Sequence, residues 1–329
     1  MKEPSSKKPY LDKVTETFNE ELEVKGGKPL YEMTPEEARE FLLDLQNKYH
    51  QSIEADLQDV EIFSEIAGTI SLRLVRPEKH KDEKLPLIIY SHGGGWVLGD
   101  ADAFDMTIKT IANHTKSVVA FVNYSRSPES QYPTAINQIY GALKYLSENP
   151  DEYNIDSDHI ALVGDSAGGN MAAAAAIKSS KEGGPELKCL VLIYPVTDAE
   201  MKTESYDLFK DGPWLTKKAM EWFWDAYIPD KHKRKEIYAS PLKADIEDLE
   251  SLPPTLIITD ENDVLRDEGE AFARKLIEAG VETVCVRINN IHHDFLLLNG
   301  LRESRATKTA YKVICKFLKH HLYNENFKR

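Results

Sequence analysis

The stretch IALVGDSAGGNMAAAAAI, residues 160–177, carries the strongest structural signal in this sequence. The apolar run before Gly164 is typical of a buried strand, and the alanine-rich run after it is typical of a helix. Between them, Gly164, Ser166 and Gly168 form a G-x-S-x-G pattern. A strand, a sharp turn and a helix together present a serine hydroxyl at the edge of a parallel sheet. Ser166 is therefore a candidate nucleophile, and a helix-capping serine in a glycine-rich turn is the alternative.

A second glycine cluster lies upstream, in LIIYSHGGGWVLGD, residues 87–100. Gly93, Gly94 and Gly95 follow an apolar run that predicts a strand beside the one before Ser166. Backbone amides of such a loop can stabilise an oxyanion formed on a serine, together with the amide of the residue after it. A phosphate cradle is the alternative, but neither cluster has the glycine spacing of a P-loop or of a dinucleotide-binding turn.

The rest of the chain alternates between short apolar runs and helical patterns. Strands are predicted at 85–91, 117–122, 159–164, 188–194, 255–259 and 283–288, and helices at about 134–148, 167–181, 267–279 and 303–322. Residues 70–74 alternate between apolar and polar, which predicts an antiparallel strand half open to water. Near the N-terminus, Thr34 and Glu37 form a capping box that predicts a helix start. The alternation predicts a doubly wound α/β domain.

A serine nucleophile needs a histidine base and a carboxylate that orients the histidine, in the chain order serine, acid, histidine. Asp263 follows the predicted strand at 255–259 and is the preferred acid. Glu261 and Asp267 are its rivals, although Asp267 also suits the start of a helix. Two adjacent histidines, His292 and His293, follow the last predicted strand, and the residues alone leave the choice between them open.

Four motifs together resemble the hormone-sensitive-lipase-like family of carboxylesterases. They are HGGGW at 92–96, NYSRSPESQYP at 123–133, GDSAGG at 164–169 and DENDVLRDE at 260–268. The resemblance runs from about residue 60 to about residue 300. It implies the α/β-hydrolase fold, with a mostly parallel eight-stranded sheet flanked by helices and a helical cap. It also implies hydrolysis of short- to medium-chain acyl esters through an acyl-enzyme.

The same resemblance implies roles for individual residues. The family's His-x-Phe pattern fits His293 with Phe295, so the implied catalytic residues are Ser166, Asp263 and His293. The implied oxyanion hole consists of Gly94, Gly95 and Ala167, while His92, Gly93 and Asp165 have structural roles. No cofactor and no metal ion are expected.

A segment of some 60 residues between the strands at 188–194 and 255–259 breaks the alternation. We expect residues 199–240 to form a cap insertion, joined by N-terminal helices in residues 1–50, over a catalytic domain of residues 51–198 and 241–329. The tryptophans proposed for the substrate pocket are Trp96, Trp214 and Trp224. The alternative for this segment is a helix packed on the sheet by Met220, Phe223, Trp224 and Tyr227.

Composition narrows the function classes. The 329 residues carry a formal net charge of −14 at pH 7, which disfavours nucleic acid and anionic membranes as partners. We found no signal-peptide pattern and no apolar run long enough for a membrane span. Cys189, Cys285 and Cys315 are unpaired in sequence and are expected to be buried thiols of a cytoplasmic protein. We expect a monomer or homodimer with a small-molecule ester substrate. An amide- or lactone-cleaving hydrolase and a non-catalytic binding protein are the alternatives.

Overall fold

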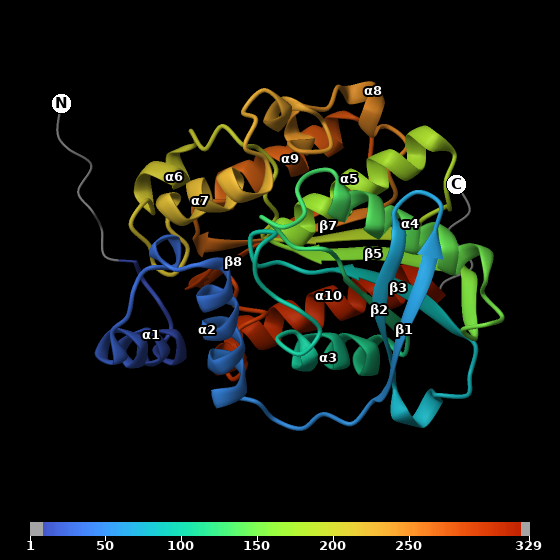
Figure 1. Cartoon of the computed structure of the whole chain (residues 1–329), viewed down its shortest axis with the longest axis horizontal. Helices are drawn as coiled ribbons and strands as arrows, with labels where there is room; N and C mark the ends of the chain where they lie inside the picture. Colours follow the sequence, from blue (N-terminus) through green and yellow to red (C-terminus); the bar gives the residue numbers. More distant parts are fainter. Residues whose placement is uncertain (1–8, 324–329) are drawn as a thin grey trace.

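The computed structural model describes residues 9–323, which form a central sheet between two layers of helices (Figure 1). Part of the predicted N-terminal segment, residues 1–8, lies outside the described residues, as do residues 324–329. The sheet has eight strands in the order β1-β2-β4-β3-β5-β6-β7-β8. The predicted α/β-hydrolase fold, a mostly parallel eight-stranded sheet flanked by helices, is confirmed.

All strands of the sheet run in one direction except β2, which lies near one edge. They are β1 (Asp56–Ser64), β2 (Gly68–Arg76), β3 (Leu85–Ser91), β4 (Val118–Asn123), β5 (Ile155–Asp165), β6 (Cys189–Ile193), β7 (Thr255–Asn262) and β8 (Thr283–His292). Strand β2 pairs antiparallel with β1 and with β4, and all later pairs are parallel. The carboxyl ends of β3 and of β5 to β8 therefore meet at one edge of the sheet, where ligands bind in open α/β sheets.

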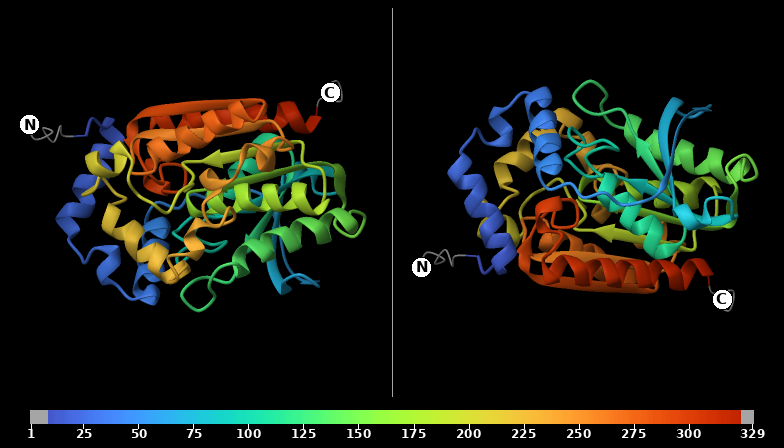
Figure 2. Two further views of the ribbon diagram at one scale, coloured as in Figure 1. Left: turned by 90° about the horizontal axis from the view of Figure 1, so that it is seen from above. Right: turned by 90° about the horizontal axis from the view of Figure 1, so that it is seen from below.

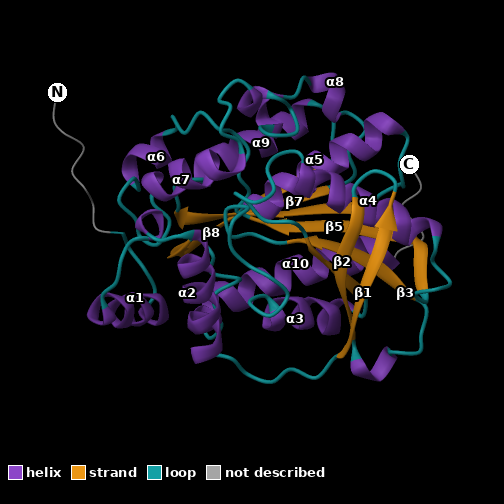
Figure 3. Ribbon diagram, in the orientation of Figure 1, coloured by secondary structure: helices purple, strands orange, loops and turns teal. Residues whose placement is uncertain are grey.

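Helices cover both faces of the sheet (Figure 3). They are α1 (Lys13–Lys25), α2 (Pro35–Lys48), α3 (Asp105–Thr115), α4 (Thr134–Glu148), α5 (Ala167–Glu182), α6 (Glu204–Leu208), α7 (Lys217–Tyr227), α8 (Ile246–Leu249), α9 (Arg266–Glu278) and α10 (Arg305–Tyr323). Helices α3 and α10 lie on one face, whereas α4, α5 and α9 lie on the other. Because both faces are covered, β3 is buried along its whole length. No helix within residues 9–323 is long and apolar enough to cross a membrane.

Helices α1, α2, α6 and α7 lie beyond the carboxyl ends of the parallel strands (Figure 2). Helix α7 contacts the 3₁₀ turn Leu30–Glu32, which connects α1 to α2. Helix α2 begins where the sequence predicted, because the Thr34 hydroxyl accepts from the Glu37 amide and the Glu37 carboxylate accepts from the Thr34 amide. Segments from the N-terminus and from the middle of the chain thus meet over one edge of the sheet.

One helix of the fold was not predicted, and the expected burial of one cysteine was wrong. Helix α3 was not predicted, because no side chain caps its start: Phe104 occupies the N-cap position without a capping hydrogen bond. Cys285 is exposed rather than buried, because β8 lies at the edge of the sheet, whereas Cys189 and Cys315 are buried as expected. All three thiols are free.

Candidate active site

Ser166 occupies the sharp turn between β5 and α5. Its φ of 54° lies in the left-handed region, which non-glycine residues seldom adopt. The flanking glycines allow this turn. A Cβ atom at Gly164 would collide with the carbonyl of Gly168, and one at Gly168 would collide with the carbonyl oxygen of Ser91. The G-x-S-x-G pattern is therefore a steric requirement of the turn, and it leaves Ser166 in the wall of a pocket.

Two hydrogen bonds connect Ser166, His293 and Asp263. The His293 Nε2 atom lies 2.8 Å from the Ser166 hydroxyl oxygen, and the Nδ1 atom lies 2.7 Å from Asp263 Oδ2. Since a carboxylate can only accept, Nδ1 donates to Asp263, and once the imidazole has lost its second proton the Nε2 atom can accept from the serine. The exposed fractions are 5% for Ser166 and 1% for each of the other two residues, so bulk water scarcely competes for these bonds.

The sheet brings these residues together, because each follows the carboxyl end of a parallel strand. Asp263 comes directly after β7, and His293 comes directly after β8, which pairs with β7. Asp263 is held by the amide of Leu265, which donates to its Oδ1 atom at 3.0 Å. His293 lies 127 residues after Ser166 and 30 residues after Asp263 in the sequence, and the three side chains still form a continuous relay.

The rival residues point elsewhere. The Glu261 carboxylate accepts from the Asn290 amide at 2.8 Å, and Asp267 accepts from the Ser205 amide at 2.8 Å. His292 lies next to the Asn19 side chain, with Nε2 3.0 Å from Oδ1. Burial lowers the pKa of His292 to about 4, so it stays neutral near pH 7.

Carboxyl groups dominate the electrostatics around His293. Burial alone would lower the pKa of this imidazole, but the neighbouring Asp263 and Asp294 carboxylates outweigh burial and raise it to about 10. The carboxyl group of Asp260 is fully buried and lies near Asp263 and His293. Burial and the charge of Asp263 raise the pKa of Asp260 well above its ordinary value, which favours its neutral form.

Asp260, Asp263 and His293 are also the one group within residues 9–323 whose geometry could suit a metal ion, with ligand-type atoms within 4.8 Å of one another. A cation there would have to displace the proton that His293 Nδ1 shares with Asp263, and so break the relay. We therefore interpret the cluster as part of the relay.

The glycine loop lies against the turn that carries Ser166. Gly94 and Gly95 line the same pocket as Ser166, and both have positive φ angles, 94° and 60°. Within the described part of the chain, their amides donate no backbone hydrogen bond. Ala167 is the first residue of α5, where an amide has no partner inside the helix. The residues implied for the oxyanion hole thus have backbone amides without a backbone acceptor among the described residues.

Protein groups also explain why the loop has no side chains. A Cβ atom at Gly93 would collide with the Asp165 carboxylate, and one at Gly95 would collide with the ring of Phe223 from α7. At Gly94, the Cβ atom would come within 2.7 Å of the Leu98 carbonyl oxygen. The loop is thus enclosed by the turn on one side and by α7 on the other.

Asp165 and His92 connect the loop to the sheet. Asp165 Oδ1 accepts from the Gly93 amide at 3.0 Å and from the Tyr90 hydroxyl at 2.9 Å. His92 Nδ1 donates to the Gly93 carbonyl at 2.8 Å, and its ring stacks on Tyr124 with 4.1 Å between centroids. Burial raises the pKa of Asp165 to about 7 and lowers that of His92 to about 3. Neither side chain lines the pocket.

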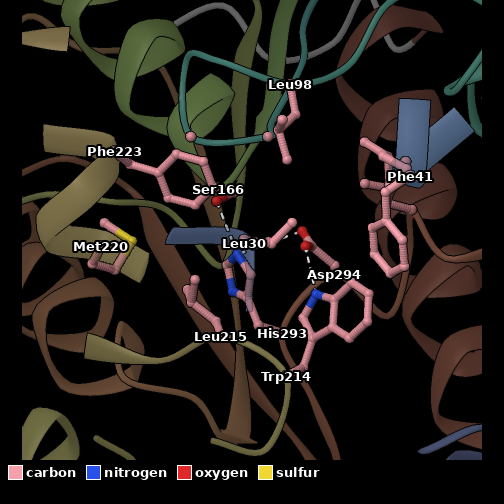
Figure 4. Close-up of a pocket in the computed structure, with 14 residues that line it drawn as sticks. Leu30, Phe41, Leu98, Ser166, Trp214, Leu215, Met220, Phe223, His293 and Asp294 are labelled. Atoms are coloured by element: carbon pink, nitrogen blue, oxygen red, sulfur yellow. Dashed lines mark hydrogen bonds and ion pairs between the residues drawn. The ribbon is translucent and has the colours of Figure 1, made fainter. Parts of the chain in front are cut away.

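The pocket beside Ser166 is mostly apolar (Figure 4). The space between its walls is about 540 Å³ when the part open to solvent is included. Its apolar walls come from the N-terminal segment, the glycine loop, the insertion and the loop after His293: Leu30, Phe41, Leu42, Leu98, Trp214, Leu215, Met220, Phe223 and Leu297. An apolar pocket with a few convergent polar groups is typical of a small-molecule site.

Of the three tryptophans proposed for the pocket, only Trp214 lines it. Trp96 and Trp224 are fully buried beside it, with 4.6 Å between their ring centroids. Trp96 also stacks on Tyr227 at 4.3 Å, so these rings fill the core between the glycine loop and α7. Asp294, which was not predicted from the sequence, also lines the pocket, directly after His293. The only sequence signal that could have pointed to Asp294 is its position next to the candidate base His293.

Comparison with known proteins places the chain in a family. Residues 88–297 match the model of a family with the α/β-hydrolase fold. The chain belongs to this family of α/β hydrolases. Its resemblance to the hormone-sensitive-lipase-like branch, which the motifs predicted, is confirmed.

Several relatives have known names or structures. An α/β hydrolase of Acanthamoeba polyphaga mimivirus is 40% identical over 309 residues, covering 94% of this chain and 88% of the relative. Carboxylic ester hydrolase LipN of Mycobacterium tuberculosis is 35% identical over 263 residues, covering 78% of this chain and 69% of the relative. The crystal structure of a thermostable esterase from Pseudomonas putida superposes with a TM-score of 0.94 at 43% identity, covering 97% of this chain and 100% of that one.

Proposed function

We propose that this protein is a serine carboxylesterase in which Ser166 is the nucleophile, His293 the general base and acid, and Asp263 the residue that orients His293. The observation that carries this proposal is the continuous pair of hydrogen bonds from Ser166 through His293 to Asp263. The names of the relatives support the reaction class, because they include esterases and carboxylic ester hydrolases.

The chemistry follows from this arrangement. Ser166 Oγ attacks the ester carbonyl carbon, and its proton moves to His293 Nε2. The carbonyl oxygen becomes an oxyanion that accepts from the amides of Gly94, Gly95 and Ala167. When the intermediate collapses, the alcohol leaves with the proton from Nε2, and the acyl group stays on Ser166. Water then repeats the sequence, releasing the carboxylic acid and restoring the serine hydroxyl.

We assign the cap to two separate parts of the chain, the N-terminal segment through about residue 50 and the insertion at 199–240. Leu30 and Phe41 from the first part, and Trp214 and Phe223 from the second, all line the pocket. Because these bulky side chains limit its length, short to medium acyl groups should fit best. Each methylene buried in the transition state is worth about 0.8 kcal/mol until the pocket is full.

A non-catalytic binding protein would need the pocket but not the relay. The two short hydrogen bonds at buried residues therefore favour an enzyme. Amides and lactones could use the same relay, but no residue of the pocket specifically favours them.

We also propose a cytoplasmic location, because three free thiols suit a reducing compartment. The expected oligomeric state remains a monomer or homodimer.

Substitution of the nucleophile tests the proposal. Ser166→Ala should lower kcat/KM on p-nitrophenyl butyrate by at least about a thousandfold, because removal of a nucleophile disables the whole relay. Ser180→Ala is the matched control, since Ser180 is an exposed serine on α5, the same helix that begins at the turn. Both variants should keep the circular dichroism of the wild type. Activity of Ser166→Ala within tenfold of the wild type would refute the serine mechanism.

A further inference from the structure

Asp294 is the one carboxylate among the residues that line the pocket. It directly follows His293 and has a φ of 64°. The left-handed region is tolerated by asparagine and aspartate better than by other side chains. In Figure 4 the Asp294 carboxylate lies between the imidazole of His293 and the indole of Trp214.

The two oxygens of this carboxylate have different surroundings. Oδ2 accepts from the indole nitrogen of Trp214 at 2.8 Å. Oδ1 is buried and has no hydrogen-bond partner among residues 9–323. An acceptor that is buried beside apolar walls without a donor is unfavourable, and a carboxylate more so than a neutral group. Among residues 9–323, Oδ1 is therefore a buried acceptor without a hydrogen-bond donor, and its ion-pair contact is His293 Nε2 at 3.5 Å.

The position of Oδ1 relative to the relay indicates which part of the substrate can reach it. Oδ1 lies 3.5 Å from His293 Nε2, the atom that delivers a proton to the departing alcohol. For that transfer the alcohol oxygen must come within about 3.2 Å of Nε2. A donor group two carbons from the alcohol oxygen can then reach Oδ1. The acceptor thus faces the alcohol part of the ester.

We propose that Asp294 is a specificity-determining residue that selects esters whose alcohol part carries a protonated amine two carbons from the ester oxygen. This inference rests on the proposed function, since it uses the position of the leaving group. A cationic donor suits the site because the hydrogen bond to a carboxylate would then be charge-assisted on both sides.

Two esters of equal shape test the inference. In 2-(dimethylamino)ethyl butyrate, a protonated nitrogen takes the place of the branching carbon of 3-methylbutyl butyrate. The two substrates therefore differ in an N–H⁺ donor but hardly in size. For the wild type at neutral pH, we expect kcat/KM to be about tenfold higher for the cationic ester, the effect of one charged hydrogen bond.

Two variants separate the charge of Asp294 from its contact with Trp214. Asp294→Asn keeps a side-chain carbonyl for the Trp214 indole and tolerates the positive φ, but it removes the charge. We expect this variant to lose the preference, so that kcat/KM is about equal for the two esters. Trp214→Phe removes the indole donor and keeps the carboxylate, so the preference should persist.

The outcomes distinguish this inference from the proposed function. Equal kcat/KM for the two esters in the wild type, or an unchanged preference in Asp294→Asn, would overturn the role of Asp294 alone. A preference lost in Trp214→Phe as strongly as in Asp294→Asn would show that Asp294 acts only by holding the indole. If the wild type hydrolyses neither ester, the proposed function fails, and this inference fails with it.

Discussion

At the scale of single residues, His293 and His292 provide the sharpest comparison. His293→Ala removes the base and should lower kcat/KM on p-nitrophenyl butyrate by at least about a thousandfold. His292→Ala should keep activity within about tenfold, because His292 contacts Asn19 and stacks near Trp214 rather than reaching Ser166. It should instead lower the melting temperature. If His292→Ala is the inactive variant, the base is His292 and not His293.

The charges near His293 predict a pH dependence. Asp263 and Asp294 stabilise the protonated imidazole, and the base works only after this proton is lost. The acidic limb of kcat/KM should therefore lie above the ordinary histidine pKa of about 6.5. Asp294→Asn removes one of these charges, so the limb should move to lower pH. A pH profile of kcat/KM on 3-methylbutyl butyrate measures this, and a shift to higher pH in Asp294→Asn would contradict the electrostatic account.

Residue identity could be predicted only where a motif constrains it. The strand, turn and helix around Ser166 and the position of Asp263 after a strand were sufficient to propose these two residues, whereas the choice of His293 over His292 needed the family's His-x-Phe pattern. Asp294 could not be found in this way, because its importance depends on where Trp214 and Nε2 lie in space. Trp96 was wrongly expected in the pocket, since sequence does not show which side of a loop faces a cavity.

At the scale of secondary-structure elements, α7 sets the size of the pocket through Phe223. This ring lines the pocket and packs over Gly95. Phe223→Ala should lengthen the pocket and move the best acyl chain from butyryl or hexanoyl toward octanoyl or longer. Burial of one more methylene in the transition state contributes about 0.8 kcal/mol, which corresponds to a nearly fourfold increase in kcat/KM.

A series of p-nitrophenyl esters from acetate to palmitate measures this change. Glu221→Ala is the matched control, because Glu221 is an exposed residue of the same helix. An unchanged chain-length profile in Phe223→Ala would show that α7 does not limit the acyl group.

Elements with a strong local signal were predicted well. The capping box of α2 and the continuous apolar strands of the sheet are examples, since both depend on neighbouring residues. Helix α3 lacks such a cap and was missed. The order of strands could not be derived from local patterns, because it depends on pairing between distant segments.

At the scale of the whole molecule, charge and pocket size together favour soluble substrates. The net charge of −14 opposes binding to anionic interfaces, and bulky side chains such as Phe41, Trp214 and Phe223 line the pocket. We expect kcat/KM to be higher on soluble butyrate esters than on emulsified long-chain triacylglycerol, by at least about tenfold. A pH-stat assay with both substrates measures this, and greater activity on the emulsion would indicate a lipase.

The folded molecule brings Ser166 to His293, and this arrangement should make the serine hydroxyl a strong nucleophile. Diethyl p-nitrophenyl phosphate reacts with such an activated serine and leaves a stable phosphoryl group on it. Mass spectrometry of the intact protein and its peptides is the most direct measurement. We predict one diethylphosphoryl group per chain, located on Ser166, with one equivalent of p-nitrophenol released and activity lost in parallel. Inactivation without a label on Ser166, or a label on another residue, would contradict the account.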